Sequence, residues 1–343
     1  MEKTLHDQTP LLKPQSLVRR GLLAAGVLAV AAVGQPVVAQ TFPEANRPIR
    51  IVVPYTAGGS SDFLARIVGK KMGEILNHNV VIDNRPGGST VVGGDYVARS
   101  KPDGYTLFLI GELTNGSLPA LNKNLPYDPA NAFAPITNLM QSPLVISVPP
   151  SFPAKTLREF VDYAKANPGK INYGSAGAGN TLHLAAAQFA SAVGIDMTHV
   201  PYKGASQALI DLVAGRIEVM FDLPQTPLPQ IQEGKLRPLA VTSNQRLTDL
   251  LPDVPTAAEA GFPQYNFATR VGIAAPAKTP DDVMKKLHSA LTQAVSDPEV
   301  SKALAERAMY VSTSASPAAY DKDIRDAVAT VTKLLKDAGV QPQ

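Results

Sequence analysis

The chain has 343 residues, of which 45% are hydrophobic and 18% charged, and this composition excludes a wholly disordered or fibrous protein. The 32 Lys and Arg residues nearly balance the 29 Asp and Glu residues, so the net charge of +3 gives no electrostatic basis for binding nucleic acid. The chain has no cysteine, which excludes disulfides, thiolate metal sites and cysteine nucleophiles. The length suits about two domains that each bury a core.

The first 39 residues have the order of an export signal. A polar segment ends in an arginine pair at Arg20, an uncharged run covers residues 21–33, and Ala39 offers a small residue at a cleavage position. A membrane anchor is the alternative, but the run is rich in Ala and Gly, is broken by Pro36, and lacks the about 20 strongly apolar residues of a spanning helix. We therefore expect residues 1–39 to be a cleaved signal, used by the Sec or twin-arginine route, and the mature protein to be periplasmic.

Apolar strands alternate with helical patterns in the next hundred residues, which we assign to a first lobe over 46–145. Strands are predicted at 49–55, 80–82 and 105–110, with helices at 63–76 and in a segment that ends at 95–100. This alternation indicates a parallel sheet that is covered on both faces.

A second α/β lobe is predicted over 146–265. The run Leu144–Val148 and the prolines after it indicate a strand that crosses between lobes. Helices are expected at 156–166 with Thr156 as cap, 181–192 and 205–214, and strands at 171–174, up to 202, 217–221 and 236–242. A strand at 271–275 returns the chain to the first lobe, which the helices at 281–296, 299–308 and 317–337 complete over 266–343. Two such lobes are typical of proteins that close on a ligand by a hinge.

Two glycine-rich loops occupy corresponding positions in the two lobes. One covers Pro54–Asp62 and the other Tyr173–Thr181, and each follows a strand and opens a helix. Glycine lets the backbone approach a ligand closely, and a helix N-terminus adds N–H donors and a partial positive charge. The alternative is two ordinary turns capped by Asp62 and Thr181, but the matched pair favours an anion site gripped from both lobes.

Other motifs do not support catalysis or a nucleotide site. The run Gly177–Leu182 lacks the third glycine of a dinucleotide fingerprint, and Ser175 stands in a run one residue too short for a hydrolase elbow. The histidines of the mature chain lack metal-ligand spacing, and His183 is interpreted as a structural residue that bonds the turn. We expect no enzyme activity, cofactor or metal. Asp222, at a strand end, either faces the cleft and selects a ligand that donates hydrogen bonds, or caps the next turn.

A set of short runs extends over the whole mature chain in a fixed order. They are Pro54-Tyr-x-x-Gly-Gly-Ser-x-Asp62, Asn84-Arg-Pro-Gly-Gly88, Lys101-Pro-Asp-Gly-Tyr-Thr-Leu107, Leu125-Pro-Tyr-Asp-Pro129, Ala164-Lys-Ala-Asn-Pro-Gly-Lys170, Tyr173-Gly-Ser-Ala-Gly-x-Gly179 with His183-Leu184, His199-Val-Pro-Tyr-Lys-Gly204, Gly234-Lys-Leu-Arg-Pro-Leu-Ala-Val-Thr-Ser243, Leu251-Pro-Asp-Val-Pro-Thr256 with Glu259-Ala-Gly261, and Ala275-Pro276 with Thr279-Pro280. In these runs the chain resembles the periplasmic receptors of tripartite tricarboxylate transporters, the Bug receptor family.

The resemblance implies a two-lobed type II periplasmic binding protein, or Venus flytrap, that closes on a small organic carboxylate and delivers it to membrane permease subunits. It nominates as ligand contacts Tyr55, Ala57, Gly58, Gly59, Ser60, Asp62, Ser175, Ala176, Gly177, Gly179, Asn180 and Thr181, with Lys203, Gly204 and Asp222 as weaker candidates. A monomer is expected. A sensor subunit that serves a membrane kinase needs the same fold and stays an alternative.

The chain departs from the family pattern at Arg270. The family often has a tryptophan near this position, whereas this chain reads Arg270-Val-Gly272. Arg270 either pairs with a distal carboxylate of the ligand or lies solvated at the rim between the lobes. The second interpretation is favoured.

Overall fold

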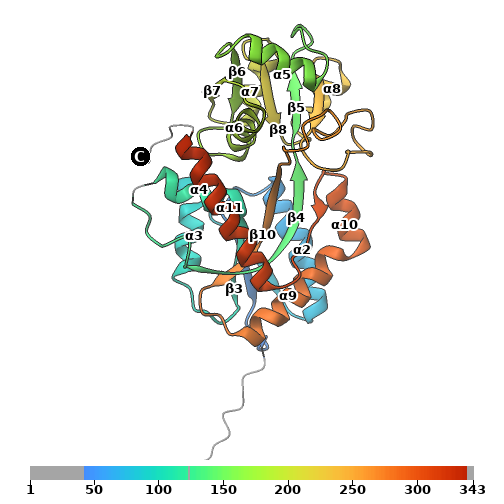
Figure 1. Ribbon diagram of the computed structural model, residues 1–343. Coiled ribbons are helices and arrows are strands. Elements are labelled where there is room, and N and C mark those ends of the chain that lie inside the picture. Colours follow the sequence, from blue (N-terminus) through green and yellow to red (C-terminus); the bar gives the residue numbers. More distant parts are fainter. Residues whose placement is uncertain (1–41, 123, 338–343) are drawn as a thin grey trace, which may run out of the picture. The chain divides into compact units, whose positions relative to one another are not determined.

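The computed structural model describes residues 42–122 and 124–337, so the expected signal peptide at 1–39 lies outside the described residues. Two β-sheets, each flanked by helices, make up the described part of the chain (Figure 1). Within these ranges no helix combines the length and the hydropathy needed to cross a membrane.

The first sheet has six strands in the order β11-β4-β10-β3-β1-β2. Their bounds are β1 Ile49–Val53, β2 Val80–Asn84, β3 Thr106–Gly111, β4 Phe133–Pro143, β10 Ala268–Pro276 and β11 Tyr310–Val311. Strands β1, β2 and β3 are parallel, and β10 runs antiparallel to β3 and β4. The helices around this sheet are α2 Ser60–Leu76, the 3-10 turn Gly88–Thr90, α3 Val91–Ala98, α4 Glu112–Leu121, α9 Asp281–Ser296, α10 Pro298–Ala305 and α11 Pro317–Asp337.

Alternation along β1 explains why helices cover both faces of this sheet. Ile51 and Val53 point into a core cluster shared with α2, α9 and α10, whereas Val52 points into a separate cluster shared with α3 and α11. All three side chains are almost fully buried. A strand that is apolar on both sides in this way needs a layer of helices on each face.

The second sheet has five strands in the order β7-β6-β8-β5-β9. Their bounds are β5 Val145–Val148, β6 Ile171–Ser175, β7 Met197–Pro201, β8 Val219–Asp222 and β9 Arg237–Val241, and the helices are α5 Leu157–Ala166, α6 Thr181–Val193, α7 Ala205–Val213 and α8 Leu228–Gln232. Phe221 of β8 packs with the α5 and α6 side of the core, and Met220 packs with α7 on the other side. Thr156 caps α5 as expected, because its hydroxyl accepts the N–H of Glu159.

A two-stranded ribbon joins the two sheets. Strand β4 passes into β5 with only Leu144 between them, and β10 returns to pair antiparallel with β4 from Ala268↔Pro143 to Pro276↔Phe133 (Figure 1). The sequence did not predict β4, because polar residues interrupt its apolar pattern. The ladder itself is irregular, with register shifts at Val271/Gly272 and Ile273/Ala274.

Helix α11 packs against both cores. Tyr320 and Ile324, near its start, belong to a cluster on the first sheet. Val331 and Leu335, two turns later, belong to the main core cluster of the second sheet. One helix from the C-terminal segment therefore bridges the two lobes in addition to the ribbon.

Candidate functional site

A cleft of about 220 Å³ lies between the two lobes, over one face of the ribbon formed by β4 and β10. Six of its lining side chains carry hydroxyl groups and one carries a carboxamide. The lining residues are Tyr55, Ser60, Ser61, Gly111, Met140, Ser142, Thr181, Leu223, Gln225, Thr269, Val271 and Met309. No charged side chain is among these described lining residues, so any charge on a ligand has to be met by neutral donors.

The first glycine-rich loop brings a helix N-terminus to the cleft. Gly58 adopts φ +87°, and Gly59 is the N-cap of α2. The first intrahelical bond is donated by the N–H of Phe63 to the carbonyl of Gly59. Ser60 and Ser61, which line the cleft, therefore begin the helix with N–H groups that have no partner inside the helix. This end of the 17-residue helix favours an anion.

Asp62 holds this loop from behind. Its Oδ2 accepts the N–H of Gly58 at 2.8 Å and Nε of Arg66 at 2.9 Å, and its Oδ1 accepts Nδ2 of Asn84 at 3.0 Å. The Arg66 hydrogen bond lowers the pKa of Asp62 to about 2, against the raising effect of burial and with smaller help from Gly58. The same Asn84 amide donates to the carbonyl of Tyr55 at 3.1 Å. Asp62 is thus a buried anchor of the loop and does not line the cleft.

The second loop brings another helix N-terminus to the same cleft. Thr181 is the first residue of α6 and lines the cleft. The cap of α6 is Asn180 and not Thr181, the cap of the alternative interpretation: the side chain of Asn180 accepts the N–H of His183 at 3.0 Å. Two backbone N–H groups of the loop are used internally: Gly177 donates to Ser175 Oγ at 3.2 Å, and Gly179 donates to His183 Nδ1 at 2.9 Å. They hold the loop together and are not directed at a ligand.

The structure brings Tyr55, Ser60 and Thr181 together out of the positions nominated from the sequence. Other nominated residues form the loops behind these three without lining the cleft: Ala57, Gly58, Gly59 and Asp62 in the first loop, and Ser175, Ala176, Gly177, Gly179 and Asn180 in the second. Lys203 is exposed and Gly204 is the N-cap of α7, and neither lines the cleft.

Asp222 is buried at the end of β8, next to the cleft residue Leu223. Its Oδ1 accepts the N–H of Leu223 at 2.7 Å. Burial raises the pKa of Asp222 to about 7, against the lowering effect of hydrogen bonds from Leu223 and Thr226. Asp222 therefore supports the turn that carries Leu223 and Gln225.

Sequence reasoning missed the contribution of the ribbon. Ser142 and Met140 of β4 and Thr269 and Val271 of β10 all line the cleft. They form two cross-strand pairs, Ser142 with Thr269 and Met140 with Val271, whose side chains point to the same face of the ribbon. The register of β4 against β10 defines this pairing. Alternation within a strand is the available signal, but the interrupted apolar pattern of residues 133–143 does not predict a strand.

Gln225 connects the two lobes beside the cleft. Its side-chain amide donates to the backbone carbonyl of Arg307, which follows α10 in the first lobe. The guanidinium of Arg307 lies 4.0 Å from the ring centroid of Phe63 near the start of α2. The cleft is thus flanked by a direct polar contact between the lobes.

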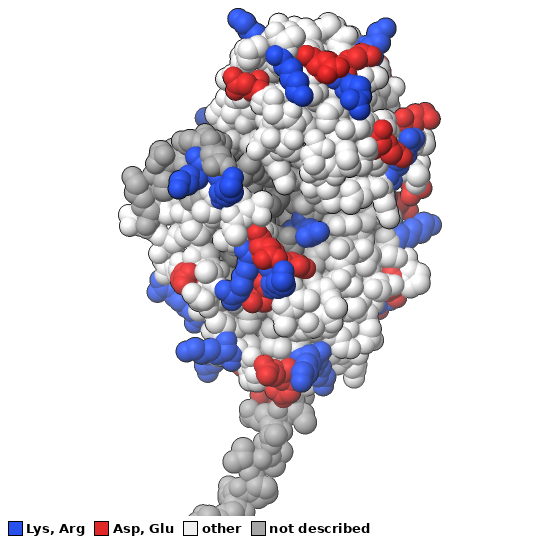
Figure 2. Space-filling model, viewed as in Figure 1, with Lys and Arg blue, Asp and Glu red and all other residues white. Residues whose placement is uncertain are grey.

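A second, larger cavity of about 640 Å³ lies on the opposite face of the ribbon. Arg270 and Gln141, the pair between the cleft-facing pairs of β4 and β10, line this cavity. Figure 2 shows a hollow beside α11, with basic and acidic side chains around it. Since Arg270 lines this cavity and is absent from the lining of the cleft, the structure favours the interpretation in which it makes no ligand contact there.

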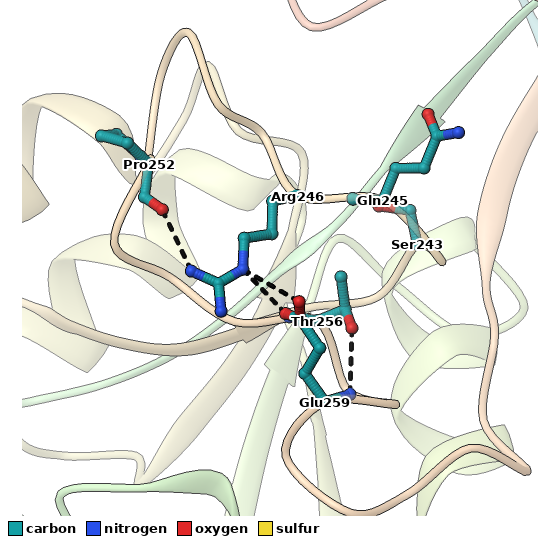
Figure 3. Close-up of polar contacts among 6 residues, drawn as sticks. All are labelled: Ser243, Gln245, Arg246, Pro252, Thr256 and Glu259. Carbon is teal, nitrogen blue, oxygen red and sulfur yellow. Dashed lines mark hydrogen bonds and ion pairs between the residues drawn. The ribbon is translucent and has the colours of Figure 1, made fainter.

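One wall of the larger cavity is the loop after β9, which a network centred on Arg246 holds in place (Figure 3). Nε of Arg246 donates to both carboxylate oxygens of Glu259, at 3.1 and 2.8 Å, and Nη1 donates to the carbonyl of Pro252 at 3.3 Å. Thr256 Oγ1 accepts the N–H of Glu259 at 3.1 Å. The charge of Arg246 is therefore already met by protein groups.

Metal binding finds no support among the described residues, where no group of three or more His, Cys, Asp or Glu side chains converges. The cleft offers hydroxyl groups, an amide and helix N-termini, and hard cations prefer carboxylates over such a set.

The fold and the cleft define a two-lobed α/β binding protein of the periplasmic type II class. Residues 64–340 match the family model described as "Tripartite tricarboxylate transporter family receptor". The chain belongs to this family, which confirms the resemblance seen in the sequence and the fold expected from it.

Curated relatives and solved structures agree with this assignment. A UPF0065 protein of Bordetella pertussis is 34% identical over 97% of this chain and 100% of its own length, and Protein BugT of the same organism is 31% identical over 81% of this chain and 85% of its own. Among solved structures, R. palustris Rpa4515 with adipate has a TM-score of 0.73 at 31% identity, and MatC from Rhodopseudomonas palustris with bound malate has 0.68 at 28% identity. They cover 87% and 85% of this chain, and 99% of each of those chains.

Proposed function

We propose that this protein captures a small organic carboxylate in the cleft by lobe closure and delivers it to the membrane permease of a tripartite transporter. The observation that carries the proposal is that Ser60 of α2 and Thr181 of α6, the first residues of two helices from different lobes, line the same cleft. Two helix N-termini supply N–H donors and partial positive charge to one anion. Six surrounding hydroxyl groups can donate further hydrogen bonds.

The size of the cleft supports a small ligand. At about 30 Å³ for each water in the liquid, 220 Å³ holds roughly seven water-sized groups. Malate and adipate, which are bound in two related structures, are organic acids of this scale. Met140, Val271 and Met309 give the cleft apolar surface for a carbon chain.

Binding without catalysis is the activity that this chain supports. Ser175 and His199 resemble a nucleophile beside its general base, because Ser175 Oγ lies 2.6 Å from Nε2 of His199. Ser175 is fully buried, however, and lies outside the cleft lining, so a bound carboxylate does not reach it. The proposal includes export by the N-terminal signal, action in the periplasm as a monomer, and no cofactor.

A thermal-shift screen tests the proposal. The mature chain, residues 40–343, is heated with mono-, di- and tricarboxylates and with the primary amide of each. A carboxylate present at 100 times its dissociation constant adds about 2.7 kcal/mol, which corresponds to a rise of several degrees. Shifts confined to carboxylates are expected. Equal shifts with the amides, or none with any acid, would overturn the proposal.

Delivery is tested separately with proteoliposomes that contain a tripartite permease. The receptor loaded with the carboxylate found in the screen should start uptake of that carboxylate, and the receptor with Gly59→Leu should not. Binding without any uptake would leave a receptor that serves a different membrane partner and would contradict the transport part of the proposal.

A further inference from the structure

Two histidines are stacked beneath the second loop of the cleft. The rings of His183, on α6, and His199, on β7, are parallel with centroids 3.9 Å apart, and Tyr173 of β6 stacks at 5.0 Å from His199. His183 is 2% exposed. Neither histidine lines the cleft, and the binding function described above does not use them directly.

Each imidazole holds one point of the loop. Nδ1 of His183 accepts the N–H of Gly179 at 2.9 Å, one residue before the N-cap of α6. Nε2 of His199 lies 2.6 Å from Ser175 Oγ. That hydroxyl accepts the N–H of Gly177 at 3.2 Å and donates to the carbonyl of Gly177 at 3.0 Å, so Nε2 of His199 is the donor toward Ser175 Oγ. The loop from Ser175 to Gly179 is therefore held by the imidazole pair at both of its ends.

The hydrogen bond from the Gly179 N–H defines which nitrogen of His183 carries the proton. An imidazole nitrogen that accepts an N–H cannot itself carry a proton, so His183 is neutral with its proton on Nε2. A second proton would have to enter at Nδ1 and would turn an acceptor toward the Gly179 N–H into a donor. Two charged rings at the observed separation would also repel each other in a buried site.

The described residues around His183 include no ion-pair partner that would stabilise a charged ring. The elements packed on α6 bring Tyr173 from β6, His199 from β7 and Asp222 from β8, while the face of α11 contributes apolar residues to the same core. Burial first, and His199 second, lower the pKa of His183 to about 4, and burial lowers the pKa of His199. Protonation is therefore resisted until well below neutral pH.

We propose that His183 and His199 are positioning residues for the second loop, and that its carboxylate-binding geometry exists only while the imidazole of His183 is neutral. The proposal rests on the proposed function of the same cleft. Acidification then releases the Gly179 N–H and the start of α6, so the receptor loses its ligand in acid while its lobes stay folded.

The first test reads the loop without any ligand. In 15N-labelled protein, His183 should show the Nε2–H tautomer from pH 8 down to about pH 5, and the Gly179 amide should be protected from exchange by at least tenfold over Gly169, an exposed glycine in the turn after α5. In His183→Leu the Gly179 protection should vanish. An unprotected Gly179 in wild type, or a His183 that titrates near pH 6.5, would overturn the proposal.

The second test uses conservative variants. In His183→Asn, Oδ1 is as many bonds from Cα as Nδ1 and can accept the Gly179 N–H, but it cannot take a proton. In His199→Gln, the amide nitrogen Nε2 takes the place of the imidazole Nε2 as the donor to Ser175 Oγ. We expect His183→Leu to weaken malate or adipate binding at pH 7.5 by at least tenfold. His183→Asn should restore binding at pH 7.5 to within threefold of wild type. At pH 3, one unit below the pKa of about 4 of His183, it should bind about tenfold more tightly than wild type, because protonation of the acid itself weakens both proteins equally.

His288→Asn is the matched control, because His288 is a half-buried histidine of the first lobe whose Nε2 lies 2.9 Å from the carbonyl of Ser314. It should leave the pH profile of binding unchanged. Equal acid loss in wild type and His183→Asn would overturn the proposal. If neither malate nor adipate binds wild type at pH 7.5, the choice of ligand or the proposed function fails, while the amide-exchange measurement still decides the role of the histidines.

Discussion

Ser142 and Thr269 face each other across β4 and β10, and both line the cleft. The next pair along the ladder, Gln141 and Arg270, lines the larger cavity on the opposite face. The ribbon that joins the lobes therefore forms the floor of the cleft as well as the connection between the sheets. Of these four residues, the two that face the cleft carry hydroxyl groups. The one charged residue, Arg270, faces the larger cavity.

The Thr269 hydroxyl is expected to contribute directly to ligand binding. Thr269→Val keeps the shape and removes the hydroxyl, so affinity for the bound carboxylate should fall three- to tenfold, or about 1 kcal/mol. Thr292→Val is the control, since the Thr292 hydroxyl is buried on α9 with no hydrogen-bond partner in the part of the chain that the structure describes. Calorimetric titration of both variants checks this, and unchanged affinity in Thr269→Val would contradict it.

Gly59 should be required for binding but not for folding. It has φ −81°, and a Cβ there would meet nothing closer than the Thr56 carbonyl at 3.9 Å. Gly59→Leu should therefore change the free energy of unfolding by no more than about 1 kcal/mol while reducing affinity at least 100-fold, because the side chain would project from the loop that carries Ser60. Gly204→Leu alters another glycine N-cap, with φ −174° and open space, and should bind normally. Normal binding by Gly59→Leu would show that this loop does not grip the ligand.

Gly179 should be sensitive for two separable reasons. Its φ is +71°, and a Cβ would lie 2.3 Å from Cδ1 of Leu121 on α4 of the first lobe. Gly179→Ala should therefore lose about 1–2 kcal/mol of stability from backbone strain and bind at least tenfold more weakly, because the clash opposes closure. Adding Leu121→Ala should recover part of the affinity but should leave the stability loss from backbone strain unchanged. A double variant no better than Gly179→Ala would mean that the contact between lobes is irrelevant to binding.

The pH dependence of unfolding should contain two opposing contributions. Between pH 6.5 and about 4 the unfolded chain protonates His183 while the folded protein does not, so this group makes stability fall as pH falls. Between pH 3.8 and about 7 the folded protein keeps a proton on Asp222 that the unfolded chain releases, so this group makes stability fall as pH rises. The two effects overlap and largely offset each other in wild type.

Single substitutions should separate them. Asp222→Asn should become less stable by about 3 kcal/mol from pH 6.5 to 4, whereas His183→Asn should become more stable over the same interval. Urea unfolding at several pH values measures both slopes. Parallel pH profiles for the two variants would contradict the assignment of either group.

The sequence was informative where local pattern and tertiary structure agree. Ile51, Val52 and Val53 form an uninterrupted apolar run, and the structure buries them on both faces of a sheet. The two loops were found because glycine and a helix start recur together, and Ser60 and Thr181 do line one cleft. Each of these features is determined by residues that lie close together in the sequence.

Features fixed by long-range pairing were missed. Ser142 lines the cleft because β4 pairs with β10 more than a hundred residues later, and no local pattern gives that register. Likewise, Asp62 was nominated as a ligand contact, but Asn84 and Arg66 draw its carboxylate into the support of the loop. Gln225 lines the cleft and donates to the carbonyl of Arg307 in the other lobe, a contact across 82 positions that no local pattern gives.

The most direct test of the account compares one carboxylate with its own primary amide by calorimetric titration of the mature protein at pH 7.5. The acid is the one with the largest thermal shift, and the amide has nearly the same shape but presents N–H donors to a site built from donors. Because helix N-termini and hydroxyl groups supply the cleft's polar contacts and no cationic side chain is among its described lining residues, we predict binding of the acid and at least 100-fold weaker binding of the amide. Equal affinity for the two would show that the cleft does not recognise a carboxylate.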